Sequence, residues 1–245
     1  MQFLISFYHT LRFWTLTTIL SIILGIVALL SALFDKSGNT AHNVARLWCR
    51  LICQWNGVAV EIRGMKNVLP GQAQIFIANH QGYYDIFALA GYLPVQLRWV
   101  AKESLFRIPF VGWSMRAAGY VGVDRRDRKK SYHSFLETTE KVKSGCSIVI
   151  FPEGTRSLNG EIGPFKKGSH LLALRTGAPV VPITIIGTWK IIQKGSAVIH
   201  PGPVRIIISP PIQINPEISD KGESVLQSIR ELICRNYAEN DFAPD

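Results

Sequence analysis

The chain has 245 residues, with 27 lysines and arginines against 17 aspartates and glutamates, for a formal net charge of +10. This length allows one substantial domain with its own core and an appendage. The basic residues are dispersed and no aromatic-basic recognition motif accompanies them, which disfavours nucleic acid as a partner. The charge instead favours an anionic membrane face or acidic substrates.

The first predicted element is an apolar helix at residues 13–34. These 22 residues carry no charge and are rich in leucine and isoleucine. As a helix the segment would be about 33 Å long, enough to cross the hydrocarbon core of a bilayer. It begins after residue 12 and lacks a small-residue cleavage site, which disfavours a removed signal peptide. We interpret it as a membrane anchor that either spans the bilayer or lies in one leaflet.

A second helix is predicted from Val44 to Trp55, where apolar residues recur at three- and four-residue intervals. Two tryptophans lie on the apolar stripe while Arg46 and Arg50 lie off it, which is typical of an interfacial helix. A core helix of the following domain is the alternative.

The domain organisation and membrane orientation follow from these two helices. We assign residues 1–57 to anchoring helices and residues 58–245 to a catalytic domain. Basic residues follow the apolar segment (Lys36, Arg46 and Arg50), and this bias favours a cytoplasmic location for the catalytic domain, at the inner membrane if the source is bacterial.

Three short apolar stretches, which read as buried strands, are each followed by polar or charged residues. The pairs are 74–78 with His80 and Asp85, 97–101 with Lys102, and 147–150 with Phe-Pro-Glu-Gly-Thr-Arg-Ser at 151–157. If these strands are parallel neighbours, their carboxyl ends meet at one edge of a sheet, where ligands bind in open α/β folds. The sequence therefore predicts a site for an anionic substrate at that edge.

His80 and Asp85 are the predicted catalytic pair. Their spacing of five is awkward on a regular helix but easy where a loop containing Gly82 enters one. An imidazole is suited to act as a base near neutral pH, and a carboxylate can hold its second ring nitrogen. The pair alone would also fit a surface histidine before an Asp-capped helix.

Lys102 and Arg156 are the predicted anion-binding cations. A guanidinium matches phosphate oxygens bidentately, and two cations can neutralise a phosphomonoester where one cannot. Two alternatives stay open: Lys102 as a solvated strand end, and Glu153 as a structural partner of Arg156.

The remaining segments are predicted to be scaffold, or more than one role is open for them. The apolar loop 109–113 fits an acyl-chain route, a bilayer contact or ordinary core packing, and the charge run 124–130 fits an exposed face or a contact with anionic headgroups or an acidic carrier. Lys166–Ser169 reads as a helix entry or an aid to phosphate or donor binding. Further helices are expected at 132–143, 168–176 and 224–237, and further strands at 180–186 and 204–209. Strands alternating with helices predict an α/β fold with a mostly parallel central sheet flanked by helices.

The four cysteines show no metal-ligand spacing, so we expect reduced thiols and no metal site. The sequence also contains neither a Gly-x-Ser-x-Gly elbow nor a Gly-x4-Gly-Lys loop. Serine hydrolases and nucleotide triphosphatases are therefore disfavoured.

Four ordered blocks resemble those of the glycerolipid acyltransferase family: Asn79–Asp85, Lys102–Gly112, Phe151–Ser157 and Val180–Ile183. Their order and gaps agree with that family over roughly residues 60 to 215. Within it the chain is most similar to the enzymes that acylate 1-acyl-sn-glycerol-3-phosphate (lysophosphatidic acid).

The resemblance implies a membrane enzyme that moves a fatty acyl group from acyl-CoA or acyl carrier protein to the sn-2 hydroxyl of lysophosphatidic acid, without a cofactor. His80 would be the base, held by Asp85. Lys102 and Arg156 would hold the phosphate, with the neighbouring residues Glu153, Gly154 and Thr155 completing the substrate-binding set. Backbone N–H groups after His80 are the expected oxyanion donors.

Two alternatives stay open. One keeps the chemistry and changes the acceptor to glycerol-3-phosphate or another lysolipid. The other is a catalytically silent membrane adaptor that binds anionic lipid, against which the intact His80 and Asp85 pair argues.

Overall fold

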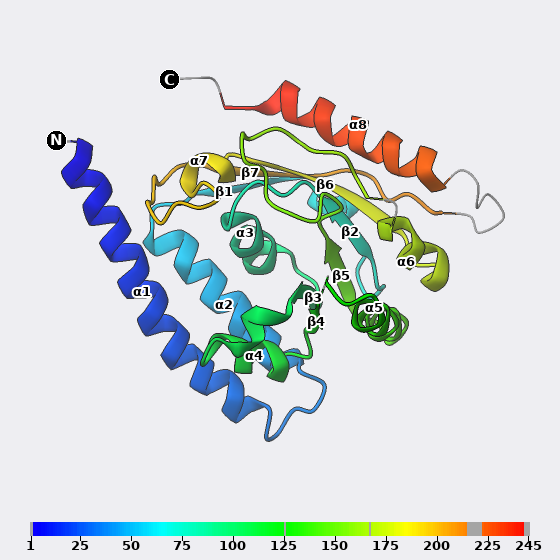
Figure 1. The fold of residues 1–245 in the computed structure, drawn as a ribbon, viewed down its shortest axis with the longest axis horizontal. Coiled ribbons are helices and arrows are strands. Elements are labelled where there is room, and N and C mark those ends of the chain that lie inside the picture. The colour runs from blue at the N-terminus through cyan, green and yellow to red at the C-terminus, as the bar shows by residue number, and fades with distance from the viewer. Residues whose placement is uncertain (1, 125, 167, 215–221, 243–245) are drawn as a thin grey trace.

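The computed structural model describes residues 2–124, 126–166, 168–214 and 222–242. Its centre is a seven-stranded sheet with helices on both faces (Figure 1). The strands are β1 (Val60–Arg63), β2 (Ile75–Ala78), β3 (Leu97–Lys102), β4 (Val121–Val123), β5 (Ser147–Ile150), β6 (Val180–Ile186) and β7 (Val204–Ile208). They lie in the order β1-β7-β6-β2-β5-β3-β4. The β6–β7 pair is antiparallel and the other five pairs are parallel, which confirms the predicted fold class.

The helices form two layers around this sheet. On one side α3 (Tyr84–Tyr92) and α2 (Asn39–Trp55) lie between the sheet and α1 (Gln2–Ser31), as Figure 1 shows. The other side carries α5 (Arg128–Lys143), α6 (Gly168–Thr176) and α8 (Gly222–Asn240). The shorter helices are α4 (Val111–Ala117), α7 (Thr188–Ile191), η1 (Met65–Asn67) and η2 (Glu103–Arg107).

Strand β2 shows how the sequence builds both cores. All four of its residues are fully buried. Because side chains alternate across a strand, Phe76 and Ala78 join the cluster on the α2 and α3 side, while Ile75 and Ile77 join the cluster on the α5, α6 and α8 side. The uninterrupted apolar run is thus the signature of a central strand, and it fixes the end of β2 just before His80.

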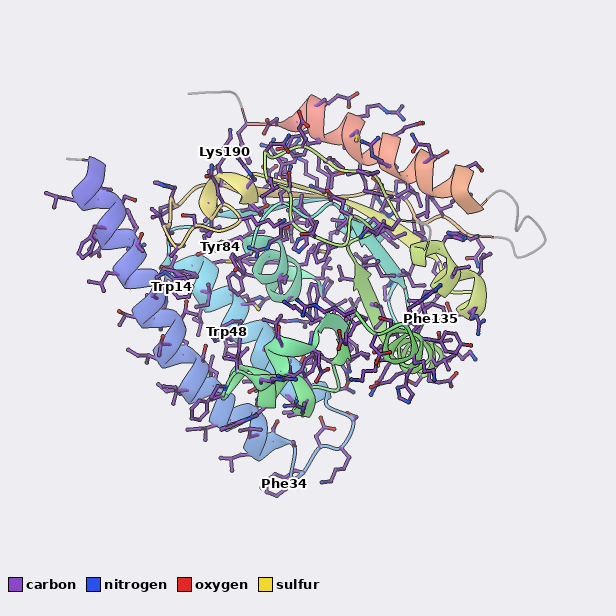
Figure 2. The ribbon with its side chains drawn as sticks, viewed as in Figure 1. Trp14, Phe34, Trp48, Tyr84, Phe135 and Lys190 are labelled. Atoms are coloured by element: carbon purple, nitrogen blue, oxygen red, sulfur yellow. The ribbon has the colours of Figure 1, made fainter. Side chains whose placement is uncertain are left out.

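Helix α1 starts eleven residues earlier than the apolar run suggested, because residues 2–12, a mixture of polar and apolar side chains, continue the same helix. With 30 residues it is about 45 Å long. By length and composition its Leu4–Ser31 stretch could cross a membrane, and only 22% of its most apolar window is buried in the protein. Large apolar side chains stand exposed along it, including Phe34 just beyond its end (Figure 2). The anchor interpretation therefore rests on an apolar face that the protein itself leaves uncovered.

Helix α2 packs on α3 as part of the main core. Its residues Cys49, Ile52 and Cys53 are buried. Arg46 donates to the carbonyls of Leu93 (2.8 Å) and Val95, and Arg50 to that of Gly91, all at the carboxyl end of α3. Cations are favourable there because they meet the negative end of the helix dipole. These contacts support the core-helix alternative, and the division of the chain at residue 57 stays a prediction.

Most predicted elements have the expected position. The strands at 147–150 and 180–186 and the helix at 168–176 match to the residue. The prediction of a loop at 109–113 was partly wrong, since α4 begins at Val111. Strands β1 (four residues) and β4 (three residues) were not predicted, because runs this short give no clear pattern of apolar residues.

Candidate active site

The predicted convergence of strand ends is present. β5 lies between β2 and β3 and is parallel to both, so the residues that follow these strands meet at one edge of the sheet. There, a cavity of about 1400 Å³ is lined by five of the seven predicted site residues: His80, Lys102, Gly154, Thr155 and Arg156. Asp85 and Glu153 are buried behind this wall.

The imidazole of His80 is held by Asp85 at hydrogen-bond distance. His80 Nδ1 lies 2.7 Å from Asp85 Oδ2, and Asp85 is fully buried. A carboxylate can only accept, so in the neutral imidazole the proton is on Nδ1 and the lone pair on Nε2. The side chain of His80 is 14% exposed and lines the cavity, which places an oriented base at its wall.

Asp85 has further partners on both oxygens. Oδ2 accepts from the backbone N–H groups of Gln81 (2.7 Å) and Gly82 (2.9 Å), and Oδ1 accepts a short hydrogen bond from the Thr188 hydroxyl. These bonds offset the cost of burying the charge. They also correct one expectation: the amides of Gln81 and Gly82, directly after His80, are occupied by Asp85 and do not face an oxyanion.

Two aromatic rings and one asparagine fix the position of His80. Its ring stacks on Phe151 at a centroid distance of 4.0 Å and an angle of 14°, and Phe151 stacks in turn on Trp99. Just before His80, Asn79 exchanges two 2.8 Å hydrogen bonds with the backbone of Ile185 on β6, as a further ladder residue would. The imidazole therefore has little freedom to rotate or shift.

Glu153 joins two loops behind the site. Its oxygens accept from the backbone N–H groups of His80 (2.7 Å) and Gly163 (2.9 Å). Burial raises the pKa of Glu153, while these two hydrogen bonds act in the opposite direction. Its carboxylate thus has backbone partners, and the predicted alternative of a pairing with Arg156 does not match this geometry.

Arg156 is poised at the cavity wall. Its Cζ lies 3.7 Å from the ring centroid of Tyr83, a cation–π contact that orients the guanidinium. Its Nη1 is buried and has no hydrogen-bond partner among the described residues. Since a buried guanidinium nitrogen without a partner is costly, this donor is suited to an anionic ligand.

Lys102 and Gly154 complete the polar wall. Lys102 is exposed at the end of β3 and lines the same cavity. Gly154 has a φ of +73°, and a Cβ there would lie 2.9 Å from Lys166 Nζ. A glycine is therefore needed for the turn and lets Lys166 approach the loop.

One part of the cavity lining is apolar. It extends between the helices to residues of α1, α2, α3 and α4, namely Leu24, Gly25, Ala28, Val44, Trp48, Ile86, Phe87, Ala90, Val111 and Met115. The predicted loop 109–113 thus contributes at least Val111 to the lining. An apolar chamber that opens beside a base and cations suits an amphiphilic substrate.

Sequence reasoning missed Thr188 and Lys194. Thr188 is 103 residues from Asp85, and the Nζ of Lys194 donates to Thr155 Oγ1 and to the carbonyl of Arg156. No local pattern signals either contact, because each depends on how distant segments fold together. In the described part of the chain, no group of three or more His, Cys, Asp or Glu residues could hold a metal ion.

A family model described as Acyltransferase matches residues 59–186, more than half of the chain. The chain is 38% identical over 183 residues to 1-acyl-sn-glycerol-3-phosphate acyltransferase BAT2, chloroplastic, of Brassica napus, a match that covers 74% of this chain and 53% of the relative. It thus spans about half the length of that relative. It is 30% identical over 222 residues to the 1-acyl-sn-glycerol-3-phosphate acyltransferase of Saccharomyces cerevisiae, covering 89% of this chain and 73% of the relative.

A solved structure agrees with these matches. The 1-acyl-sn-glycerophosphate (LPA) acyltransferase PlsC from Thermotoga maritima superimposes with a TM-score of 0.85 at 29% identity, over 98% of this chain and 97% of that one. The sequence blocks, the fold and the geometry around His80 agree with these likenesses. The chain belongs to the acyltransferase family.

Proposed function

We propose that this protein transfers a fatty acyl group from a thioester donor to the sn-2 hydroxyl of lysophosphatidic acid, forming phosphatidic acid. The observation that carries the proposal is the 2.7 Å His80–Asp85 pair in a cavity that also exposes Lys102 and Arg156. The names of the Brassica, yeast and Thermotoga relatives support the same acceptor.

The chemistry follows from the tautomer of His80. Nε2 takes the proton of the acceptor's hydroxyl, and the oxygen attacks the thioester carbonyl. The tetrahedral intermediate then expels the thiolate, which takes the proton back from the imidazolium. Asp85 stabilises the imidazolium in between. The acceptor supplies the hydroxyl, so no serine is needed and no acyl-enzyme forms.

The rest of the cavity supports the choice of acceptor. Lys102 and Arg156 provide two positive charges for the phosphomonoester, and Thr155 and Gly154 belong to the same wall. Glu153 contributes by holding the backbone of His80. The apolar arm between α1, α2, α3 and α4 accommodates hydrocarbon.

The membrane setting and the donor belong to the same proposal. The exposed apolar face of α1 lies in the membrane, and the basic residues that follow it favour the cytoplasmic face for the catalytic domain, where acyl-CoA and acyl carrier protein are found. The donor is therefore one of these two thioesters, used as a substrate, and the enzyme has no resident cofactor.

The test uses membranes containing the full chain, incubated with lysophosphatidic acid and either acyl-CoA or acyl carrier protein charged with the same fatty acid. Mass spectrometry would follow phosphatidic acid, with glycerol-3-phosphate and other lysolipids as competing acceptors. We expect product from lysophosphatidic acid that disappears in His80→Ala and persists in His133→Ala, a change at an exposed histidine of α5.

Two other results would redirect the proposal. Product on a different acceptor would keep the mechanism and reject the substrate. No transfer from either donor to any acceptor, with the protein shown to be folded, would favour a non-catalytic lipid-binding adaptor.

A further inference from the structure

Lys194 lies in the segment between α7 and β7, outside the four sequence blocks, yet it reaches the predicted substrate-binding loop. Its Nζ donates to Thr155 Oγ1 at 3.0 Å and to the backbone carbonyl of Arg156 at 3.2 Å. One half-buried ammonium therefore contacts two consecutive residues of the Phe151–Ser157 stretch. Hydrogen bonds from a charged donor are stronger than neutral ones, so these contacts can hold the loop in one conformation.

The segment that carries Lys194 is itself fastened to helix α1. The indole Nε1 of Trp14 donates to the carbonyl of Ala197 at 3.0 Å, and the backbone N–H of Ile199 donates to Thr10 Oγ1 at 3.1 Å. Figure 1 shows the segment between α7 and β7 beside α1, and Figure 2 labels Trp14 there. Ile199 is fully buried in the main core. Lys194 thus projects from a segment that is held in place by its contacts with α1.

The two hydrogen-bond acceptors of the Lys194 ammonium, Thr155 Oγ1 and the Arg156 carbonyl, indicate how it can influence ligand binding. Its bond to the Thr155 hydroxyl occupies a lone pair and leaves the hydroxyl proton free to donate to an anion. Its bond to the Arg156 carbonyl fixes the backbone from which the guanidinium reaches over Tyr83. The ammonium also adds a positive charge to the loop that carries Arg156.

We propose that Lys194 is a positioning residue for Thr155 and Arg156, and that it thereby sets the affinity for the phosphate of the acceptor. It acts through these two residues and takes no part in the proton transfer at His80. This role rests on the proposed function, because it concerns the acceptor's phosphate.

The test compares the steady-state kinetics of Lys194→Met with those of the unsubstituted full-length protein in membranes. We expect the KM for lysophosphatidic acid to rise about tenfold while kcat stays within about twofold. Lys194→Arg keeps the charge and a donor, so it should restore most of the affinity. Lys190→Met, at an exposed lysine of α7, is the matched control and should leave both constants unchanged (Figure 2).

A second arm separates positioning from general stability. Because the part of the effect that acts through Arg156 is already lost, Lys194→Met should raise KM by only about two- to threefold further in an Arg156→Gln background, the remainder acting through Thr155. Three results would overturn the role. These are an unchanged KM in Lys194→Met, a fall in kcat without a change in KM, as loss of folded protein would give, and a rise in KM that is fully additive with that of Arg156→Gln. Absence of lysophosphatidic acid turnover by the unsubstituted protein would instead overturn the proposed function, and this role with it.

Discussion

The two sides of the cavity are built differently. On the His80 side Asp85 is fully buried and saturated with partners, since it accepts from His80, Gln81, Gly82 and Thr188. On the cation side Lys102 is exposed, and Arg156 retains a nitrogen without a partner among the residues that the structure describes. This contrast fits the proposed function, in which the first side is pre-organised for proton transfer and the second retains a donor for an anion. We therefore expect substitutions on the first side to lower kcat and those on the second to raise KM.

The largest expected effect is that of Asp85→Asn. The amide oxygen can take the place of Oδ2 and accept from His80, Gln81 and Gly82 while the NH2 group faces Thr188, but the negative charge that stabilises the imidazolium is lost. We expect kcat to fall by about 10²- to 10⁴-fold with little change in KM. Asp241→Asn, at an exposed position near the carboxyl end, is the control. A fall of less than about tenfold in folded protein would show that the charge of Asp85 does not assist the base.

Arg156→Gln should act on the other side. Losing the guanidinium removes a charge-assisted contact with the phosphate, so we expect the KM for lysophosphatidic acid to rise by roughly 30-fold and kcat to change far less. Arg235→Gln, at an exposed arginine of α8, should have no effect. A loss confined to kcat would place Arg156 at the reacting carbonyl and break the division between the two sides.

Thr188→Val tests the His80 side of the cavity with a smaller expected effect on kcat. It keeps the shape of the side chain and leaves Asp85 Oδ1 without the hydroxyl. Because a hydrogen bond to a buried charge contributes roughly 1.5–3 kcal/mol, we expect kcat to fall by about tenfold. Thr188→Ser, which keeps the hydroxyl, should recover most of it. Equal losses in the two variants would mean that the hydroxyl is not what matters at this position.

The last prediction concerns stability instead of catalysis, at a residue outside the reactive end of the cavity. His42 is fully buried, with Nδ1 2.8 Å from the Tyr120 hydroxyl and Nε2 accepting from the Leu97 amide. Burial, followed by the charges of Arg46 and Arg98, lowers the pKa of His42 to about 3. The unfolded chain binds a proton at about 6.5, so between these values it binds more protons than the folded chain, and stability falls on acidification.

At pH 5 this difference amounts to about 2 kcal/mol. Denaturant unfolding at pH 7.5 and at pH 5 would measure it. In His42→Gln the loss of stability between the two pH values should shrink by that amount, whereas in His133→Gln it should not. The same loss in His42→Gln as in the unsubstituted protein would assign the acid sensitivity to other groups.

The sequence was sufficient to predict the elements that carry their own signal. Buried strands such as 147–150 are continuous apolar runs, and the residues after them form local motifs, so the sheet and the meeting of His80, Lys102 and Arg156 could be predicted. Glu153 was placed in the right loop, but its bond to the His80 amide was not foreseen.

What escaped prediction depends on long-range packing. Thr188 contacts Asp85, and Lys194 contacts Thr155, because β6 pairs with β2 in the folded sheet. No pattern in the neighbouring sequence predicts that pairing. Helix α2 was ambiguous for a related reason. An apolar stripe with flanking arginines looks the same whether it faces lipid or α3, and the partners of Arg46 and Arg50 decide between the two.

The most direct test of the mechanism is a single-turnover reaction in which purified full-length protein in excess meets a thioester donor and lysophosphatidic acid. Rapid quenching would be followed by mass spectrometry of both the lipid and the intact protein. We expect phosphatidic acid to accumulate while the protein mass never changes, and His80→Ala to form no product. A protein species that gains the mass of one acyl group and then decays into phosphatidic acid would contradict direct attack by the acceptor.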